Sequence, residues 1–443
     1  MSEEDAAGSG GPTTVADPTA AGDAAIGAYT RRMRPLRIAY AVVVTVVVVI
    51  ALVVVKIAYD HGELSHTHLH TVTSAPPSVA NSATPAAGLS KAWSSTDTTA
   101  LGTPVAEGTV VTHDAHTVRG RNALTGAQTW SYTRTDRTVC AAVQTELVTV
   151  AVYRLDGSCD ELTALESTTG QRRWTRTLDT DGAVFDGPTR YYVDGSSVMF
   201  VSRTSIYTLA VSGTADSGNG GLNEWTFYHR GCTIDGAVLG SAGALISQSC
   251  QGQDCQGHKF CGDGHQLLLR DGAANYDEKS TTNPDVVKWN DLGKDLVPTS
   301  AGATVTARDP NGATLTSLAA GTGKSLGTIA LSGDSGAAAP SAFAFGTDAD
   351  LIWIGQHTYA LPRGKTSFAW QAATTGLPTP SHSTAILAGS PALAPTTSGA
   401  VALDPADGTV TARYPVAAPE PGGTVVPLGA GVLVTGSPTV VYR

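Results

Sequence analysis

The 443-residue sequence is poor in charged residues and methionine, and it contains no recognisable catalytic motif. Charged residues make up 15% of the chain, and Asp and Glu outnumber Lys and Arg by 38 to 28. Because nucleic-acid binding needs clustered Lys and Arg against phosphates, this balance argues against DNA or RNA as a partner. We find no Gly-x-Ser-x-Gly, His-Glu-x-x-His or calcium-loop pattern. The sequence therefore assigns no catalytic residue, no cofactor and no metal ligand.

Sustained helical periodicity is absent from residue 88 to the C-terminus. Short apolar stretches alternate there with turns, and the chain as a whole is rich in turn formers, with 49 Gly and 23 Pro. One such stretch, residues 146–153, alternates apolar and polar positions as a half-buried strand does. This pattern predicts an all-β domain over residues 88–443.

The one long apolar run covers residues 38–55 and contains no charge. At the helical rise, 18 residues span about 27 Å, close to the hydrocarbon thickness of a bilayer. Arg31, Arg32, Arg34 and Arg37 precede it, so the positive-inside rule places its N-terminal side in the cytoplasm. A cleavable signal peptide would have a shorter leader and a small-x-small cleavage site, and neither occurs here. The sequence predicts a single-pass cell-membrane protein with a cytoplasmic N-terminus and an extracytoplasmic C-terminal domain.

Composition divides the chain into four regions. Residues 1–37 lack periodic apolar positions over most of their length and predict a disordered cytoplasmic tail. Residues 38–59 form the transmembrane helix with its interfacial end. Residues 60–87 are polar and contain prolines, as expected of an extracytoplasmic stalk. Residues 88–443 form the β domain.

An internal repeat organises this domain. Four segments, residues 123–134, 164–178, 318–331 and 403–416, share a tight turn at Thr-Gly or Asp-Gly followed by an extended stretch. In two of them a tryptophan follows four residues after the glycine. Adding the other tryptophans that fit gives eight equivalent positions: Trp93, Trp130, Trp174, Trp225, Trp289, Gly327, Trp370 and Ala412.

The spacing of these positions predicts a β-propeller. Most of the intervals are 37–51 residues, the length of one four-stranded antiparallel blade, and a β-sandwich explains neither the repeated turn nor the reuse of tryptophan. Residues 422–443 can form three strands without a tryptophan strand, and residues 88–95 provide the tryptophan strand alone. Joining the two closes the ring with eight blades. Seven blades remain an alternative because the unit 232–289 is irregular.

The motif A-L-x-x-x-T-G-x-x-x-W, clear in two units, resembles the pyrroloquinoline-quinone-like propeller repeat, here in a membrane-anchored arrangement similar to actinobacterial envelope proteins. Families with this repeat include quinoprotein dehydrogenases and the propeller lipoprotein of the outer-membrane β-barrel assembly machinery. The quinoproteins stack their cofactor on a disulfide between adjacent cysteines and use a calcium-linked carboxylate base. This sequence has no adjacent cysteine pair and no matching carboxylate, so we expect no quinone cofactor.

Two histidine-containing segments suggest metal sites without establishing them. Asp60, His61, Glu63, His66, His68 and His70 form a histidine-rich patch, in which His66, His68 and His70 would share one face of an extended chain. A solvated stalk is the simpler interpretation, and the sequence leaves the question open. The insertion with Cys255, His258, Cys261 and His265 has zinc-like spacing, but a disulfide is favoured outside the cytoplasm.

Six cysteines predict three disulfides in an oxidising compartment. Cys140 and Cys159 lie 19 positions apart, and Cys232 and Cys250 lie 18 apart at equivalent places of another unit. In an antiparallel meander these positions lie at the same end of the sheet, which predicts the pairs Cys140–Cys159 and Cys232–Cys250. Cys255 and Cys261 remain to close the loop of the insertion.

The resulting functional hypothesis is a membrane-anchored propeller that binds an envelope protein or a cell-wall polymer. A rigid disc with variable loops performs such work without a reactive residue. The alternative is an extracytoplasmic enzyme with an unidentified site in the central channel. A cluster of buried carboxylates or histidines in that channel would favour the enzyme.

Overall fold

The computed structural model describes residues 39–56, 63–79, 85–155, 157–178, 190–194, 197–211, 222–228, 231–251, 263–271, 287–302, 304–331, 341–345, 348–378, 391–420 and 423–443. The chain divides into two compact units, Met1–His66 and Thr67–Arg443.

The first unit contains one long helix, Ala39–Lys56, which is long and apolar enough to cross a membrane. It falls within the predicted span 38–59. A single helical turn, α2 (Glu63–His66), follows in the described part of this unit.

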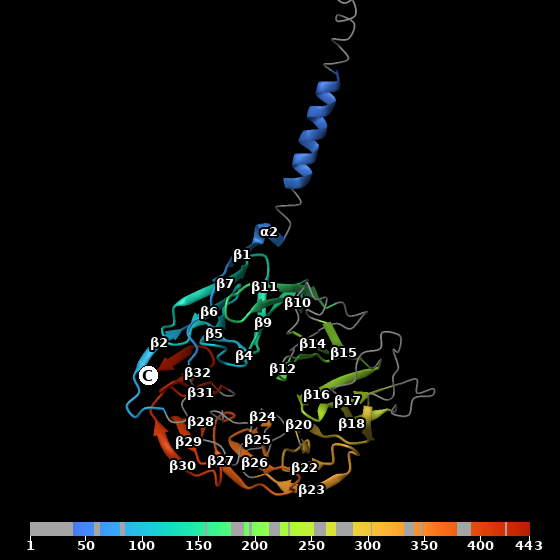
Figure 1. Ribbon diagram of the computed structural model, residues 1–443. Helices are drawn as coiled ribbons and strands as arrows, with labels where there is room; N and C mark the ends of the chain where they lie inside the picture. Colours follow the sequence, from blue (N-terminus) through green and yellow to red (C-terminus); the bar gives the residue numbers. More distant parts are fainter. Residues whose placement is uncertain are drawn as a thin grey trace, which may run out of the picture. The chain divides into compact units, whose positions relative to one another are not determined.

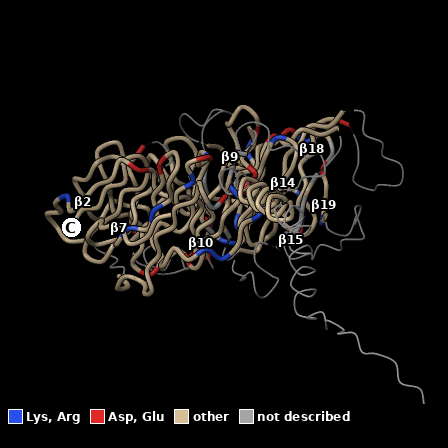
Figure 2. Tube along the Cα trace, turned by 90° about the horizontal axis from the view of Figure 1, so that it is seen from above, with Lys and Arg blue, Asp and Glu red and all other residues tan. Residues whose placement is uncertain are grey.

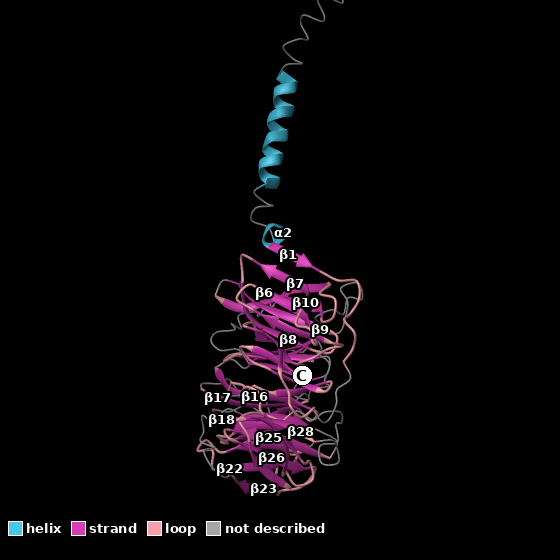
Figure 3. Ribbon diagram, turned by 90° about the vertical axis from the view of Figure 1, so that its left-hand side faces the viewer, coloured by secondary structure: helices cyan, strands magenta, loops and turns pink. Residues whose placement is uncertain are grey.

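The second unit is a β-propeller, and its described secondary structure consists of strands (Figure 3). The described strands form eight sheets arranged as a ring, which we number as blades 1–8 along the chain (Figure 1). The pattern of eight positions in the sequence therefore corresponds to eight blades, and the seven-blade alternative is wrong.

The blades contain three to five strands in the described residues. Blade 1 contains β1 (Thr67–His70), β3 (Thr98–Thr99), β5 (Thr109–His113), β6 (Thr117–Asn122) and β7 (Gln128–Arg134). Blade 2 contains β4 (Leu101–Gly102), β8 (Thr138–Gln144), β9 (Val148–Leu155), β10 (Ser158–Glu166) and β11 (Arg172–Thr177). Blade 3 contains β12 (Arg190–Asp194), β13 (Ser197–Val201), β14 (Ser205–Ala210) and β15 (Leu222–Tyr228). Blade 4 contains β16 (Cys232–Gly240), β17 (Gly243–Cys250), β18 (Gly264–Arg270) and β19 (Val287–Leu292).

The second half of the ring follows the same order. Blade 5 contains β20 (Val297–Ala301), β21 (Val305–Arg308), β22 (Thr314–Leu318) and β23 (Ser325–Ala330). Blade 6 contains β24 (Ser341–Phe345), β25 (Ala349–Ile354), β26 (His357–Pro362) and β27 (Trp370–Ala373). Blade 7 contains β28 (Ala392–Thr396), β29 (Gly399–Leu403) and β30 (Val410–Tyr414). Blade 8 contains β31 (Val425–Leu428), β32 (Gly431–Val434), β33 (Thr439–Tyr442) and β2 (Lys91–Ser95).

The ring is closed by strands from opposite ends of the propeller unit. β2 pairs antiparallel with β33, so that Trp93 lies opposite Val441. Two backbone hydrogen bonds between Ser90 and Arg443, both 2.8 Å long, continue this pairing beyond the strands. The predicted joining of residues 88–95 to the C-terminal segment is thus confirmed, and it pairs strand edges that would otherwise be exposed.

The eight repeat positions lie on the outermost regular strand of each blade. In seven blades the residue just before the repeat position is the extra residue of a β-bulge. In blade 1, for example, Gly120 pairs with Trp130 and Arg121 pairs with Gln128, so Thr129 has no partner across the ladder. A bulge turns the strand locally and changes the direction of the next side chain. It therefore directs the tryptophan toward the next blade.

Apolar side chains pack between the faces of neighbouring blades. Between blades 1 and 2, Trp130 and Tyr132 contact a cluster that includes Tyr153 and Leu165, and all four side chains are fully buried. Equivalent clusters join most of the other blades in the described part of the ring. This interfacial packing is the hydrophobic core of the domain, and it fixes the relative positions of the inner strands.

Part of the expected stalk, beginning at Thr67, belongs to the propeller unit. β1 pairs with β7 as a fifth, outer strand, with His68 opposite Thr133. Further along, the Val72 amide donates to the carbonyl of Thr169 in blade 2 at 3.1 Å, and Val79 packs against a cluster shared by blades 1 and 8. Within the expected stalk 60–87, residues 67–79 thus make strand and packing contacts with the blades. Their composition was uninformative because the contacts that hold them are made by residues distant in the sequence.

Candidate functional site

A hollow lies where the inner strands β8 and β12 begin. Its volume is about 480 Å³. It is lined by Thr98, Thr99, Leu101, His113, Cys140, Ala141, Tyr191 and Tyr192. These residues come from the inner parts of blades 1, 2 and 3, with β4 and β12 on the inner side of the ring (Figure 1). Among the described residues, the lining combines aromatic rings and hydroxyl groups and contains no carboxylate or ammonium group.

A short crossing segment forms one wall of this hollow. After β3, the chain passes to blade 2, where β4 runs parallel to β8 and the Thr103 amide donates to the Gln144 carbonyl at 2.7 Å. Gly102 has a φ of +89°, and a Cβ there would overlap that same carbonyl, so only glycine permits the approach. Leu101, next to it, remains 48% exposed at the hollow.

The buried Gln144 side chain links the two blades that flank the hollow. Its amide nitrogen donates to the Thr109 carbonyl at 3.3 Å, and its oxygen accepts from the Val111 amide at 3.2 Å. Because an unpaired amide in this buried place would be costly, both bonds hold β5 against β8. The wall of the hollow is consequently fixed by hydrogen bonds as well as by packing.

An ion-pair network lies beside the hollow. Asp97 accepts from Arg121 at 2.8 Å and from Arg119 at 3.2 Å, and Arg119 also donates to Asp114 at 2.7 Å. Burial alone would raise the pKa of Asp97, but the hydrogen bond from Arg121 and the charges of both arginines outweigh it and lower that pKa. The network thus neutralises its own charges. Figure 2 shows charges of both signs interspersed among mostly uncharged positions.

One histidine, His113, lies in the described lining. Burial lowers its pKa below 6.5, against the opposing effects of the Asp114 backbone and the nearby carboxylates. The imidazole is therefore neutral at pH 7. A neutral histidine can hydrogen-bond a ligand, and the described lining adds the phenol groups of Tyr191 and Tyr192.

The two disulfides lie at the ends of blades 2 and 4. Cys140–Cys159 joins β8 to β10 across the end of β9, with a Cα separation of 6.1 Å. Both cysteines lie at register irregularities, which bring two strands that are not neighbours close enough to be bridged. Cys232–Cys250 instead joins directly opposite residues of β16 and β17, with a Cα separation of 4.0 Å. The expected pair Cys255–Cys261 lies outside the described residues and stays a prediction.

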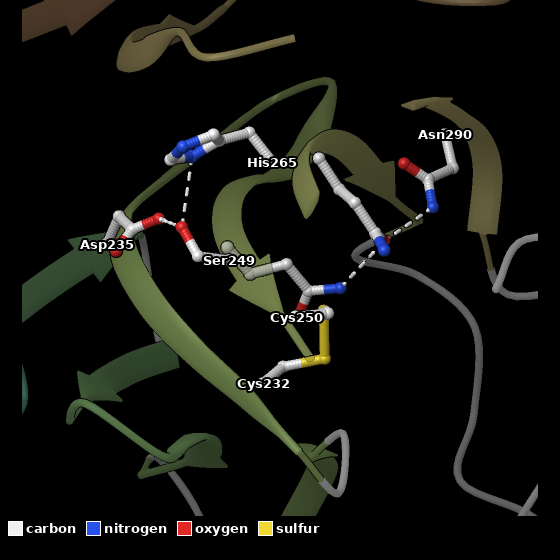
Figure 4. The surroundings of a disulfide bond; sticks show 8 residues. Cys232, Asp235, Ser249, Cys250, His265 and Asn290 are labelled. Carbon is white, nitrogen blue, oxygen red and sulfur yellow. Dashed lines mark hydrogen bonds between the residues drawn. A yellow bond between two sulfur atoms is a disulfide. The ribbon is translucent and has the colours of Figure 1, made fainter. Parts of the chain in front are cut away.

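A second polar cluster lies near Cys232–Cys250 in blade 4 (Figure 4). Ser249 donates its hydroxyl proton to Asp235 at 2.6 Å and lies 3.0 Å from Nδ1 of His265. His265 Nδ1 also lies 3.6 Å from Asp295. Sequence reasoning missed this cluster because its members are 14 to 30 residues apart. Strand register was the missing signal, since Ser249 and His265 are cross-strand partners and Asp235 is a bulge residue.

This arrangement does not activate Ser249 as a nucleophile. A serine has one hydroxyl proton, and here Asp235 accepts it, so Nδ1 of His265 must be the donor in its contact with Ser249. A nucleophilic serine would instead donate to the histidine base. The cluster is exposed and suits a hydrogen-bonding surface.

Of the histidine-rich patch, the structure describes Glu63, His66, His68 and His70. His68 and His70 lie on the exposed outer strand β1, whereas His66 ends α2. Within the described residues, no group of three His, Cys, Asp or Glu side chains is placed to hold a metal ion. Cys255, His258 and Cys261 of the insertion lie outside the described residues, as do Asp60 and His61.

Comparisons with known proteins agree with the repeat. The family profile described as outer membrane protein assembly factor BamB matches residues 71–241. A search of the curated proteins gives no match. Among solved structures, the chain is similar to BamB from Moraxella catarrhalis, with 17% identity and a TM-score of 0.47 over 81% of this chain and 98% of that one.

Two further solved structures are similar at lower identity. Sqt1 from Saccharomyces cerevisiae is 8% identical, with a TM-score of 0.49 over 82% of this chain and 98% of that one. The quinohemoprotein alcohol dehydrogenase ADHIIG from Pseudomonas putida HK5 is 12% identical, with a TM-score of 0.47 over 80% of this chain and 76% of that one.

The topology defines this protein as an eight-bladed β-propeller that is closed by the pairing of β2 with the C-terminal strand β33. In the matched segment 71–241, and in the repeated turn and tryptophan, the chain is similar to the pyrroloquinoline-quinone-like β-propeller repeat family. Its residues do not fit the quinone cofactor of the dehydrogenases. No two of its six cysteines are adjacent in the sequence, whereas the quinoproteins stack the cofactor on a disulfide between adjacent cysteines.

Proposed function

We propose that this protein is a membrane-anchored, extracytoplasmic binding module that holds an envelope protein or a cell-wall polymer. The observation that carries the proposal is the hollow at the inner strands, which offers aromatic rings and hydroxyl groups without a charged group. Pockets of this composition bind through shape and a few hydrogen bonds. The match to the BamB profile, from a family of assembly factors, supports a protein partner.

The proposed placement outside the cytoplasm rests on three features. The helix Ala39–Lys56 can cross a membrane, four arginines precede it, and the propeller contains disulfides. Disulfides persist in oxidising compartments, and arginines stay on the cytoplasmic side. Protease added to intact spheroplasts should digest the chain beyond residue 60 and spare a tag at residue 1. Digestion of that tag would reverse the proposed orientation.

Site-specific photocrosslinking in intact cells tests the binding proposal. A photoreactive residue at position 101 should form one discrete adduct with a protein or polymer, because Leu101 borders the hollow and is 48% exposed. Leu326 is the matched control, since it is 49% exposed but lies on the outer strand β23. We expect no specific adduct there.

A second variant connects the adduct to the hollow itself. Thr98→Arg should suppress the adduct at position 101 by introducing a charge into the uncharged lining. Equal labelling at positions 101 and 326 would contradict binding at the hollow. Adducts only with small molecules at position 101 would favour the alternative of an enzyme with a central-channel site.

A further inference from the structure

The interface between blades 5 and 6 reverses the packing found at the tryptophan-bearing interfaces. At four interfaces, a tryptophan of one blade covers a turn glycine of the next: Trp93 on Gly126, Trp130 on Gly170, Trp289 on Gly323 and Trp370 on Gly408. In blade 5 the tryptophan position is Gly327, and a Cβ there would lie 2.9 Å from Cβ of Thr366 in blade 6. Thr366 precedes Trp370 by four residues, the place of the turn glycine. At this interface the glycine is therefore in the earlier blade and the larger residue, Thr366, is in the later one. Among the described residues, this pair has no indole and no indole hydrogen bond.

The same interface contains a buried carboxyl group. Asp350, on β25 of blade 6, is only 2% exposed. It faces Gly302 of blade 5, where a Cβ would lie 2.5 Å from Oδ2 and 2.6 Å from Oδ1. Neither carboxyl oxygen accepts a hydrogen bond of normal geometry from the described residues. A buried carboxylate without such bonds is strongly disfavoured relative to the protonated acid.

The charged groups around Asp350 do not compensate for its burial. Burial raises its pKa to about 6 from the model-peptide value of 3.8, and the Thr304 backbone and the charge of Arg363 offset only part of this rise. Asp348 precedes β25, and His357 lies at the opposite end of β26. The residues that blade 5 places nearest, Gly302 and Thr304, are uncharged.

We propose that the interface between blades 5 and 6 is a pH-sensitive seam of the ring, held closed when Asp350 is protonated and loosened when Asp350 is ionised. The direction follows from linkage. The folded-state pKa of this acid lies above its unfolded value, so ionisation above that pKa favours any state that exposes the carboxyl group to water. The seam therefore tightens on acidification, between about pH 6 and pH 4. Most carboxyl groups instead have a lowered folded-state pKa, so that acidification destabilises the folded protein.

Hydrogen exchange of the full chain in detergent tests the seam. Exchange rates at pH 5 and pH 7.5 are corrected for intrinsic exchange and compared for peptides that cover β25 and β7. If opening exposes Asp350 fully, the shift from 3.8 to about 6 makes the opening equilibrium of β25 roughly tenfold more favourable at pH 7.5 than at pH 5. The control strand β7, at the interface with Trp130 and Gly170, should not show this change.

Two variants separate the effect of Asp350 from that of the neighbouring histidine, His357. Asp350→Asn should remove the pH dependence of β25 and protect it at both pH values, whereas His357→Gln should leave the dependence intact. The wild-type comparison stands even if a variant fails to fold. The seam is refuted by equal corrected protection of β25 at the two pH values, or by a pH dependence that survives in Asp350→Asn.

Discussion

The indole N–H of Trp130 in blade 1 donates to the carbonyl of Ser167 in blade 2 at 3.0 Å, while its ring lies over Gly170. The glycine follows the accepting residue by three positions. The same relation recurs at Ala123 and Gly126, Ala320 and Gly323, and Pro405 and Gly408, each with a tryptophan of the preceding blade. At these four interfaces the tryptophan thus combines apolar burial with a hydrogen-bonded indole N–H, a group that is costly to bury unpaired.

Replacing the covered glycine should cost more than replacing an uncovered one. Gly170 and Gly364 have nearly the same φ, +73° and +67°, so alanine should strain both backbones by about 1–2 kcal/mol. A Cβ at 170 would lie 2.6 Å from Cγ of Trp130, whereas one at 364 meets nothing within 4 Å. We expect Gly170→Ala to destabilise by about 1–3 kcal/mol more than Gly364→Ala, because the ring must shift. Urea unfolding of both variants measures this difference, and equal midpoints would contradict it.

The interface between blades 5 and 6 should accommodate a tryptophan at position 327 only when Thr366 is also replaced by glycine. Gly327→Trp alone overpacks against Thr366, and Thr366→Gly alone leaves a void and adds backbone freedom. The double variant should be more stable than the sum of the two single effects by about 1 kcal/mol or more in a double-mutant cycle. Strict additivity would show that size complementarity does not operate across this interface.

Removing the closing strands should prevent soluble folding. Truncation after residue 422 deletes β31, β32 and β33 and leaves β2 without its partner strand. The unpaired edges then favour aggregation, and the apolar residues of blade 8 no longer cover blades 1 and 7. Deletion of residues 1–66 is the control, since it leaves the propeller unit whole. A soluble truncated chain with a cooperative thermal transition would argue against closure by this blade.

Protonation of Asp97 at acid pH should weaken its ion pairs with Arg119 and Arg121 beside the hollow. Its folded-state pKa is lowered, so its stabilisation is complete above about pH 3.8 and is lost as the pH falls through the folded value. Asp97→Asn should therefore destabilise the protein by about 1.5–3 kcal/mol at pH 7, because Arg119 and Arg121 lose a charged acceptor. The difference from wild type should shrink below pH 3.8. A constant difference from pH 7 to pH 3 in chemical unfolding would exclude this role.

Local and periodic features could be predicted from the sequence because each is encoded by neighbouring residues. The turn at Gly170 and the tryptophan four residues later predicted a blade edge. The interval between Cys140 and Cys159 predicted that they meet at one end of a meander. The charge-free run before Lys56 predicted the long helix. In each case a glycine φ, a strand length or a helical length is set within a few tens of residues.

Only the tertiary structure determined which residues line the hollow and which residues meet at the interface between blades 5 and 6. His113 and Tyr191 are 78 residues apart and share the hollow because the ring places inner strands of neighbouring blades together. Residues 67–70 became an outer strand because β7 presented a free edge. In the sequence, Asp350 resembles any acidic residue next to a turn. It is buried because the folded chain places it against Gly302 of another blade. Spacing along the chain determined which strands form. Contacts between strands distant in the sequence determined which side chains meet. Only the tertiary structure could decide this, because the burial and desolvation of a residue depend on every element that covers it.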